Sequence, residues 1–293
     1  DELFFGAIDQ LMEQFKYSPI SSDTVEKYFA QYSGLDLGDF FRDWIFRPGY
    51  NVVLVDSFQS TEGQDGFDVK LFLQQKLKGT DQFHDGLPVF YSVYDKNWNQ
   101  EDGQTTMSGQ REAKSLKTSL NPVLIVLYEQ NQQAQARTFD EIVISKTGLV
   151  ATKNFFWNKL NITSVEDSAL LLLEHIWAGP DGIKDFDNQP FRLSNYHYWR
   201  VSGLNLSNLT MTGEVFFDGR EAGNGGHLDG DLVSVQEDSL VLLFRESAAS
   251  DWGEYGFYSK DVLGSNINAF GLVKLSEVMP GEYAFANIDH RVL

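Results

Sequence analysis

The chain has 293 residues, with 42 acidic and 23 basic side chains, a formal net charge of −19 and no cysteine. This charge argues against a nucleic-acid partner, whose phosphates would be repelled, and the lack of cysteine excludes disulfides, thiolate zinc sites and a cysteine nucleophile. Hydrophobic residues at 42% suffice for two domain cores, and no apolar run is long enough to predict a membrane span.

Residues 1–49 are predicted to be helical. Apolar residues recur at helical spacing from Leu3 to Phe15, and Ser18-Pro19 ends this first stripe. Asp23 is expected to cap a second helix, with Glu26 three residues later as in a capping box. Three short helices cannot cover so many large apolar side chains by themselves. The segment therefore needs a partner surface, either the following β-region or a domain outside this chain.

The end of the helical segment holds the residues that we expect to dock between domains. A third helix would bury aromatic side chains, and Pro-Gly closes it directly before a β-rich run that starts at Asn51. The docking residues predicted from this junction are Phe40, Phe41, Trp44, Pro48 and Gly49.

From Asn51 the hydrophobic period changes to two, as in half-buried antiparallel strands. Phe67, Val69, Leu71 and Leu73 show this alternation. The fold class predicted is mainly β: a short N-terminal helical segment followed by two antiparallel β-sandwich modules of immunoglobulin-like type, over residues 50–160 and 161–293. A polar linker is expected near residues 150–166.

Seven strands are expected in the second module. They lie near Ala169–Trp177, Phe191–Val201, Met211–Phe217, Asp231–Val235, Leu240–Arg245, Ala269–Leu275 and Tyr283–Asn287.

Motifs that carry chemistry are missing from the sequence. None of the five histidines lies four residues from another, so no helix face offers a zinc pair, and Gly-x-Ser-x-Gly is absent. We predict no catalytic, cofactor-binding or metal-binding residue in this chain. Asp229 and Asp231 allow two interpretations, a calcium site or an ordinary acidic turn, and so do Asp181, Asp185 and Asp187. Neither group has the spacing of the twelve-residue calcium loop.

Two aromatic runs allow a binding function. They span Tyr196–Arg200 and Trp252–Tyr258. Exposed aromatics would suit a glycan or peptide ligand, whereas sandwich cores need the same residues, and the core interpretation is favoured. A glycosidase with paired carboxylates is a further alternative, although no two acidic residues stand out.

The stretch from Thr24 to Val55 resembles the end of the catalytic domain of zinc aminopeptidases of the aminopeptidase N type, a group of gluzincins. The resemblance rests on Gly34-Leu35-Asp36-Leu37-Gly38-Asp39-Phe40-Phe41-Arg42-Asp43-Trp44, then Pro48-Gly49 and the apolar strand Asn51–Val55. It covers some 30 residues. The family's His-Glu-x-x-His, third zinc ligand and Gly-x-Met-Glu-Asn motif match no position in this chain.

This resemblance implies a non-catalytic C-terminal region of an exported metallopeptidase, periplasmic, cell-surface or secreted. Its partners would be the upstream catalytic domain, which would hold the zinc, and the peptide substrates of the whole protein. The chain itself would support that domain and substrate access. The alternative is a stand-alone β-sandwich module that binds glycan or peptide.

Overall fold

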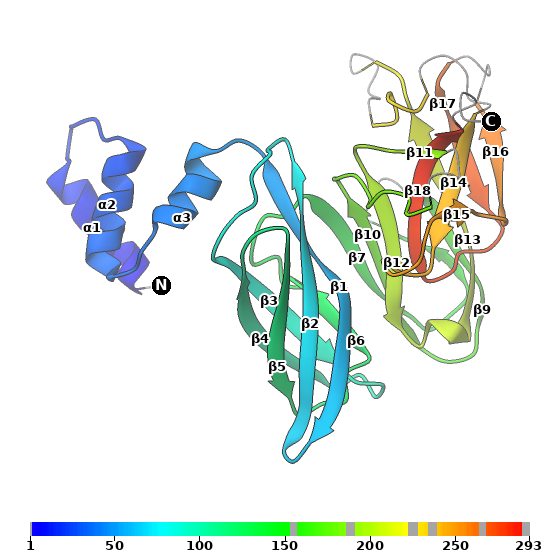
Figure 1. The fold of residues 1–293 in the computed structure, drawn as a ribbon, viewed down its shortest axis with the longest axis horizontal. Coiled ribbons are helices and arrows are strands. Elements are labelled where there is room, and N and C mark those ends of the chain that lie inside the picture. Colours follow the sequence, from blue (N-terminus) through cyan, green and yellow to red (C-terminus); the bar gives the residue numbers. More distant parts are fainter. Residues whose placement is uncertain are drawn as a thin grey trace.

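A computed structural model describes residues 2–152, 157–185, 191–221, 228–233, 239–263 and 268–288. A helical unit, a first sandwich and a second sandwich follow one another along the longest axis of the molecule (Figure 1). The prediction of a mainly β chain with a short N-terminal helical segment and antiparallel sandwiches is confirmed. The immunoglobulin-like strand order stays a prediction.

The helical unit contains four short elements. They are α1 (Glu2–Gln14), α2 (Ser22–Ser33), α3 (Gly38–Phe41) and a π-helical turn (Arg42–Phe46). Ser21, rather than Asp23, caps α2, because its hydroxyl accepts a hydrogen bond from the Thr24 N–H at 3.3 Å. Gly34 ends α2 with φ of 70°, in the left-handed region that glycine tolerates.

The first sandwich pairs two three-stranded antiparallel sheets. One sheet has the order β1-β2-β5 and the other β4-β3-β6. Alternate residues of both sheets form the core, including Val53, Leu71, Val89 and Met107. The strands are β1 (Tyr50–Gly63), β2 (Gly66–Lys78), β3 (Leu87–Tyr94), β4 (Gln100–Met107), β5 (Arg111–Thr118) and β6 (Leu124–Leu127).

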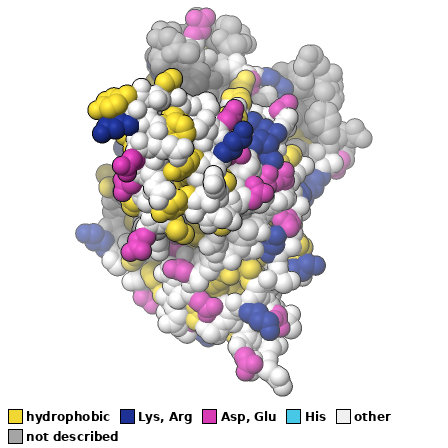
Figure 2. All heavy atoms as spheres, turned by 90° about the vertical axis from the view of Figure 1, so that its left-hand side faces the viewer, with side chains coloured by type: hydrophobic (Ala, Val, Ile, Leu, Met, Phe, Trp, Pro, Cys, Tyr) yellow, Lys and Arg dark blue, Asp and Glu magenta, His cyan; other side chains and the backbone are white. Residues whose placement is uncertain are grey.

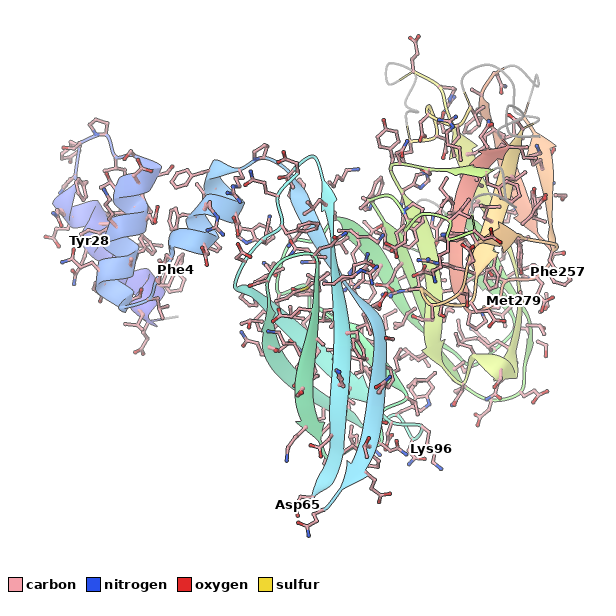
Figure 3. All side chains as sticks on the ribbon, viewed as in Figure 1. Phe4, Tyr28, Asp65, Lys96, Phe257 and Met279 are labelled. Carbon is pink, nitrogen blue, oxygen red and sulfur yellow. The ribbon has the colours of Figure 1, made fainter. Side chains whose placement is uncertain are left out.

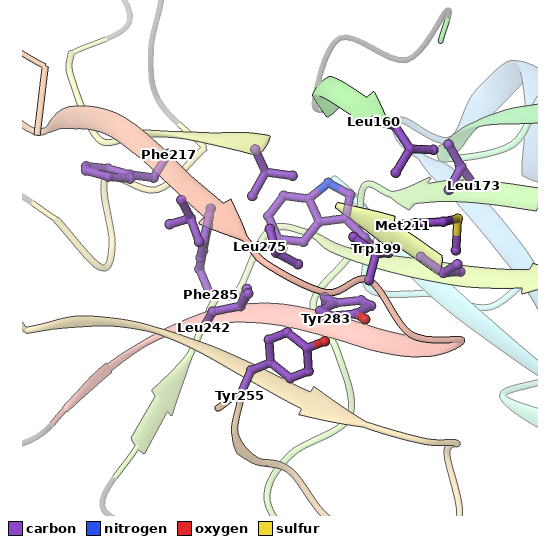
Figure 4. Packing of buried hydrophobic residues seen from close by; sticks show 14 of the residues in the cluster. Leu160, Leu173, Trp199, Met211, Phe217, Leu242, Tyr255, Leu275, Tyr283 and Phe285 are labelled. Carbon is purple, nitrogen blue, oxygen red and sulfur yellow. The ribbon is translucent and has the colours of Figure 1, made fainter. Parts of the chain in front are cut away.

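The second sandwich pairs a seven-stranded sheet with a five-stranded sheet. The first has the order β15-β14-β18-β12-β10-β7, with β11 on β18, and the second the order β16-β17-β13-β9-β8. Trp199, Phe217, Tyr255, Tyr283 and Phe285 meet in its core (Figure 4). The strands are β7 (Arg137–Ile144), β8 (Gly148–Val150), β9 (Trp157–Val165), β10 (Ala169–Ile176), β11 (Phe191–Leu193), β12 (Tyr198–Leu204), β13 (Leu209–Asp218), β14 (Leu240–Arg245), β15 (Gly253–Glu254), β16 (Tyr258–Val262), β17 (Phe270–Leu275) and β18 (Gly281–Ile288).

Strand β10 shows how the two sandwiches join. All its residues are buried, because one face lies in the second sandwich core and the other faces the first sandwich. Leu171 and Leu173 belong to the inner core, whereas Leu170 and Leu172 pack near Tyr94 and Val126 of the first sandwich. A strand buried on both faces explains the continuous apolar run in its sequence.

Four further sequence predictions differ from the structure. Strands β7, β8 and β9 pair with strands of the second sandwich, so the boundary falls between β6 and β7 rather than at residue 160. The expected linker contains β9, whose polar residues face outward. Phe191–Val201 is two strands on either side of a bend, and residues 231–233 form a turn rather than a strand, with 234–238 outside the described residues.

Candidate docking surface

A buried carboxylate fastens the helical unit to the first sandwich. Asp43 Oδ1 accepts from Arg42 Nε at 2.7 Å and from Arg47 Nη1 at 3.1 Å. Its Oδ2 accepts from Arg42 Nη2 at 2.9 Å and from the Asp85 N–H at 3.1 Å. Burial alone would raise the pKa of Asp43, but the hydrogen bonds from Arg42 and the Asp85 N–H hold this pKa below its usual value. The charged carboxylate therefore joins the π-helical turn to the connection between β2 and β3.

Trp44 packs on the same connection. Its ring meets the His84 ring edge to face, with centroids 4.9 Å apart, and it lies against the first sandwich core. The loop is held in place because the His84 N–H donates to Gln75 Oε1 at 2.8 Å. Trp44 thus uses part of its surface within this chain, and a contact with another domain stays a prediction.

Phe41 is buried in the helical unit, whereas its neighbours are not. The Phe41 ring lies 5.6 Å from the Phe40 ring and 6.1 Å from the Phe46 ring. Phe40 is 52% exposed and Phe46 is 48% exposed. Of the two phenylalanines predicted to dock, Phe41 therefore packs inside the helical unit, and Phe40 remains available for a partner.

Pro48 and Gly49 shape the junction. Gly49 has φ of 92°, and a Cβ at this position would lie 2.6 Å from the Lys78 carbonyl oxygen. Only glycine fits such a close approach of two backbones. Pro48 is exposed beside the loop from Gly79 to Gln82. These two residues set the path of the chain into β1.

Exposed apolar side chains are concentrated in the helical unit. Of 16 exposed large hydrophobic residues in the described part of the chain, 11 lie within residues 2–50, and only Ala7, Leu11 and Phe41 are buried hydrophobics there. Figure 2 looks onto this end and shows hydrophobic side chains over it, with charged groups beside them. We call this set the helical apolar surface: Leu3, Phe4, Phe5, Met12, Tyr17, Ile20, Leu35, Phe40, Ile45, Phe46 and Tyr50.

Helices α1 and α2 cover each other only in part. Phe4 packs on Phe29 with ring centroids 5.7 Å apart, and Phe15 packs on Tyr28 at 6.2 Å. No residue of α2 is buried. Phe4 and Tyr28 lie at the end of the molecule opposite Phe257 and Met279 of the second sandwich (Figure 3). The sandwiches therefore leave most of this helical pair uncovered.

A row of alternating charges on the seven-stranded sheet connects the second sandwich to the first. The row crosses five neighbouring strands of the seven-stranded sheet, and its pairs Glu174–Arg200, Arg200–Glu282 and Glu282–Arg245 stand opposite each other in the strand register. Arg200 Nε donates to Glu174 Oε2 at 2.5 Å, and Arg137 Nη1 donates to Glu174 Oε1. We call it the charge ladder: Arg137 (β7), Glu174 (β10), Arg200 (β12), Glu282 (β18) and Arg245 (β14).

The charge ladder reaches the first sandwich at several points. Arg200 Nη1 donates to the Val55 carbonyl at 3.1 Å, and Arg137 Nη2 donates to the Leu127 carbonyl. Asp181 lies next to Arg245 and accepts from Lys76 Nζ at 2.8 Å. Burial alone would raise the pKa of Asp181, but the charge and hydrogen bond of Lys76, with help from Gln74 and Arg245, lower this pKa to about 2. The two sandwiches thus share buried ion pairs in addition to apolar contacts.

The aspartates for which the sequence allows calcium binding are bound to other groups of the protein. Asp229 is fully buried; its Oδ1 lies 2.8 Å from His197 Nε2, and its Oδ2 accepts the Asp218 N–H at 2.7 Å. Asp231 Oδ2 accepts from the Asn195 backbone and side chain at 3.0 Å. Asp185 donates its N–H to Asp251 at 2.9 Å, and Asp187 lies outside the described residues. Across the described ranges, no group of three His, Asp or Glu side chains could hold a metal ion.

The histidines and aromatic runs are mainly structural. His175 and His197 are buried, with His175 Nε2 and His197 Nδ1 3.0 Å apart. Tyr198, Trp199, Trp252 and Tyr255 are buried, which confirms the core interpretation for them. Tyr196 and Phe257 are the two exposed aromatics of these runs. His227 and His290 lie outside the described residues.

Comparisons with known proteins leave the family open. A scan against protein-family models gives no match to this chain, and a search of curated proteins gives none either. Among the described helices, none combines the length and the hydropathy needed to cross a membrane.

Proposed function

We propose that this chain is a non-catalytic region of a zinc aminopeptidase of the aminopeptidase N type, docked through its helical unit onto the catalytic domain. The observation that carries the proposal is the helical apolar surface. A two-helix unit with two buried side chains in α1 and none in α2 lacks a core of its own. Exposed apolar areas of this kind are typical of surfaces that contact another protein.

The rest of the chain has the properties of a support. Asp43 and Trp44 fix the helical unit to the first sandwich, and the charge ladder fixes the first sandwich to the second. An arm built in this way would hold a catalytic domain and restrict the approach of peptides to its cleft. Zinc and the residues that bind it would belong to the catalytic domain, and export of the whole protein is part of the same proposal.

The stand-alone binding module has less support. It requires tryptophans at the surface, but Trp199 and Trp252 are buried and Trp44, Trp98 and Trp177 are half-buried. Trp157 lies where no side chain is described. Core packing, rather than ligand stacking, accounts for the aromatic runs.

Activity of the native protein tests the proposal. Antiserum raised against this chain would be used to capture the protein from its source cells, and hydrolysis of amino-acid p-nitroanilides would be measured. We expect activity in the captured protein that 1,10-phenanthroline removes and added zinc restores, and none from the purified 293-residue chain. Activity in the purified chain, or none in the captured protein, would contradict the proposal.

A further inference from the structure

A crevice opens between the two sandwiches at one end of the charge ladder. Its walls come from both sandwiches: β1 and β6 on one side, and β7, β10 and β12 on the other. Leu124, Phe58, Phe139 and Leu172 give it apolar walls, and Arg137, Glu174 and Arg200 line its polar part. A concave site with apolar walls and a few convergent polar groups is the usual form of a small-ligand site.

A bulge in β1 shapes this crevice. The pairing of β1 with β2 shifts register between Val55 and Ser57. Asp56, at the shift, is turned to Arg111, whose Nη1 donates to Asp56 Oδ2 at 3.2 Å. The Val55 carbonyl accepts from Arg200 Nη1 across the sandwich boundary. Bulges often lie beside functional sites, where they redirect backbone and side-chain groups.

The crevice offers hydrogen-bond donors that the chain itself does not use. Arg200 is 18% exposed at its side chain, and only its Nε and Nη1 have partners among the described residues. The hydroxyls of Ser57, Ser202 and Ser247 also line the crevice and have no hydrogen-bond partner in the described part of the chain. Arginine binds carboxylates through a fork of N–H groups, so this donor set suits a carboxylate.

The buried ion network that reaches the crevice carries a small positive charge. The buried network contains four cations (Arg137, Arg200, Arg245 and Lys76) and three carboxylates (Glu174, Glu282 and Asp181), which leaves one positive charge in a chain of net charge −19. Buried charge is stabilised when it is paired. The pair Arg111–Asp56 adds no net charge.

Glu141 limits the charge that the ligand can carry. It stands opposite Leu172 in the pairing of β7 with β10, next to the crevice. Burial and the neighbouring Glu129 raise the pKa of Glu141. A ligand with a second negative charge would be repelled by this acidic pair.

We propose that this crevice binds a monocarboxylate that carries an apolar group, as an N-acyl amino acid or the C-terminus of a peptide does. The carboxylate takes the free donors of Arg200 and the serine hydroxyls, and the apolar group lies against Leu124 and Phe139. The site does not depend on the docking of the helical unit, so failure of either proposal leaves the other standing.

Isothermal titration calorimetry of the 293-residue protein tests this site. The ligands are N-acetyl-L-leucine and acetyl-Gly-Gly-Leu, each compared with its C-terminal amide. We expect both acids to bind at least tenfold more tightly than their amides. Tighter binding of N-acetyl-L-leucine would indicate a small acid as the ligand, and tighter binding of acetyl-Gly-Gly-Leu would indicate a peptide C-terminus. Equal affinity of acid and amide, or no binding of either acid, would overturn the proposal.

Two substitutions locate the binding. Ser202→Leu fills the crevice and leaves the charge ladder intact, and it should weaken binding of the better acid at least tenfold. Ser115→Leu, on exposed β5, is the matched control and should leave the affinity unchanged. Arg200→Lys should weaken binding without removing the positive charge. Unchanged affinity in a folded Ser202→Leu protein would place the ligand elsewhere and overturn the proposal.

Discussion

Asp43 fixes the π-helical turn against the first sandwich. It is buried between two arginines and a backbone N–H, while Asp39, which bonds the same Arg42, is 57% exposed. Hydrogen bonds to a buried charged group contribute more than an exposed ion pair does. The two aspartates therefore form a matched pair for substitution.

We expect Asp43→Asn to lower the free energy of unfolding by about 2 kcal/mol, since Arg42 and Arg47 lose their charged acceptor. Asp39→Asn should change it by less than about 0.5 kcal/mol. Urea unfolding followed by near-UV circular dichroism, which reports the packing of the aromatic side chains, measures both. Equal effects of the two substitutions would mean that Asp43 is no anchor.

Glu174 holds two guanidinium groups in the charge ladder. Burial would raise its pKa, but the charges of Arg200 and Arg137 hold this pKa below its usual value. Glu174→Gln leaves two buried cations without their carboxylate and should cost about 3 kcal/mol in urea unfolding. The control is Asp68→Asn, which removes the exposed pair with Lys117 and should have almost no effect. A loss below about 1 kcal/mol for Glu174→Gln would contradict this account.

At the scale of elements, α1 presents to solvent apolar side chains that none of the described elements covers. Phe5 is 61% exposed and Met12 is 67% exposed. In Phe5→Ser/Met12→Ser, we expect less binding of the dye ANS and less self-association, with unfolding of the sandwiches unchanged within about 0.5 kcal/mol. The matched control is Tyr196→Ser/Phe257→Ser on the second sandwich. A larger drop in dye binding for the control would place the main apolar surface there.

The sequence predicts elements better than it predicts their partners. The change of period at Asn51 and the Pro48-Gly49 junction correctly mark where helices give way to strands. The sequence of β9 predicts a linker, because its apolar and polar residues alternate only weakly and the strand lies on an outer sheet. No local pattern assigns β7 to the second sandwich, since that depends on its pairing with β10.

The candidate sites were predictable only in part. The need for a partner surface follows from the helical pattern. The exposure of Phe40 does not, because the pattern places Phe40 on the buried face of the third helix, whereas the structure leaves it 52% exposed. The charge ladder is invisible in the sequence, because Arg137, Glu174 and Glu282 are brought together by strand register alone. Asp229 belongs to an acidic turn in the sequence, yet its bonding partner His197 lies directly before β12, 32 residues away in the chain.

At the scale of the whole molecule, acid should weaken the contact between the sandwiches, because Asp181 pairs with Lys76 of the first sandwich and Arg245 of the second. The pKa of Asp181 is about 2 in the folded protein and 3.8 in the unfolded reference, so its stabilisation is fully present above pH 4 and is lost as pH falls towards 2. This difference corresponds to about 2 kcal/mol at neutral pH.

Asp181→Asn should remove this part of the acid dependence. We expect the variant to be less stable at pH 7 and to differ little from the unsubstituted protein at pH 2, as measured by urea unfolding at both values. Asp68→Asn serves again as the exposed control. A stability difference that is as large at pH 2 as at pH 7 would contradict the role given to this carboxylate.

We propose that the helical unit continues into a larger enzyme. The most direct measurement is the mass of the native polypeptide in its source cells, by immunoblot with antiserum against this chain. The account predicts a band well above 33.2 kDa, the mass of the chain described here. A single band at 33.2 kDa would contradict it, because the helical apolar surface would then have no upstream catalytic domain to cover it.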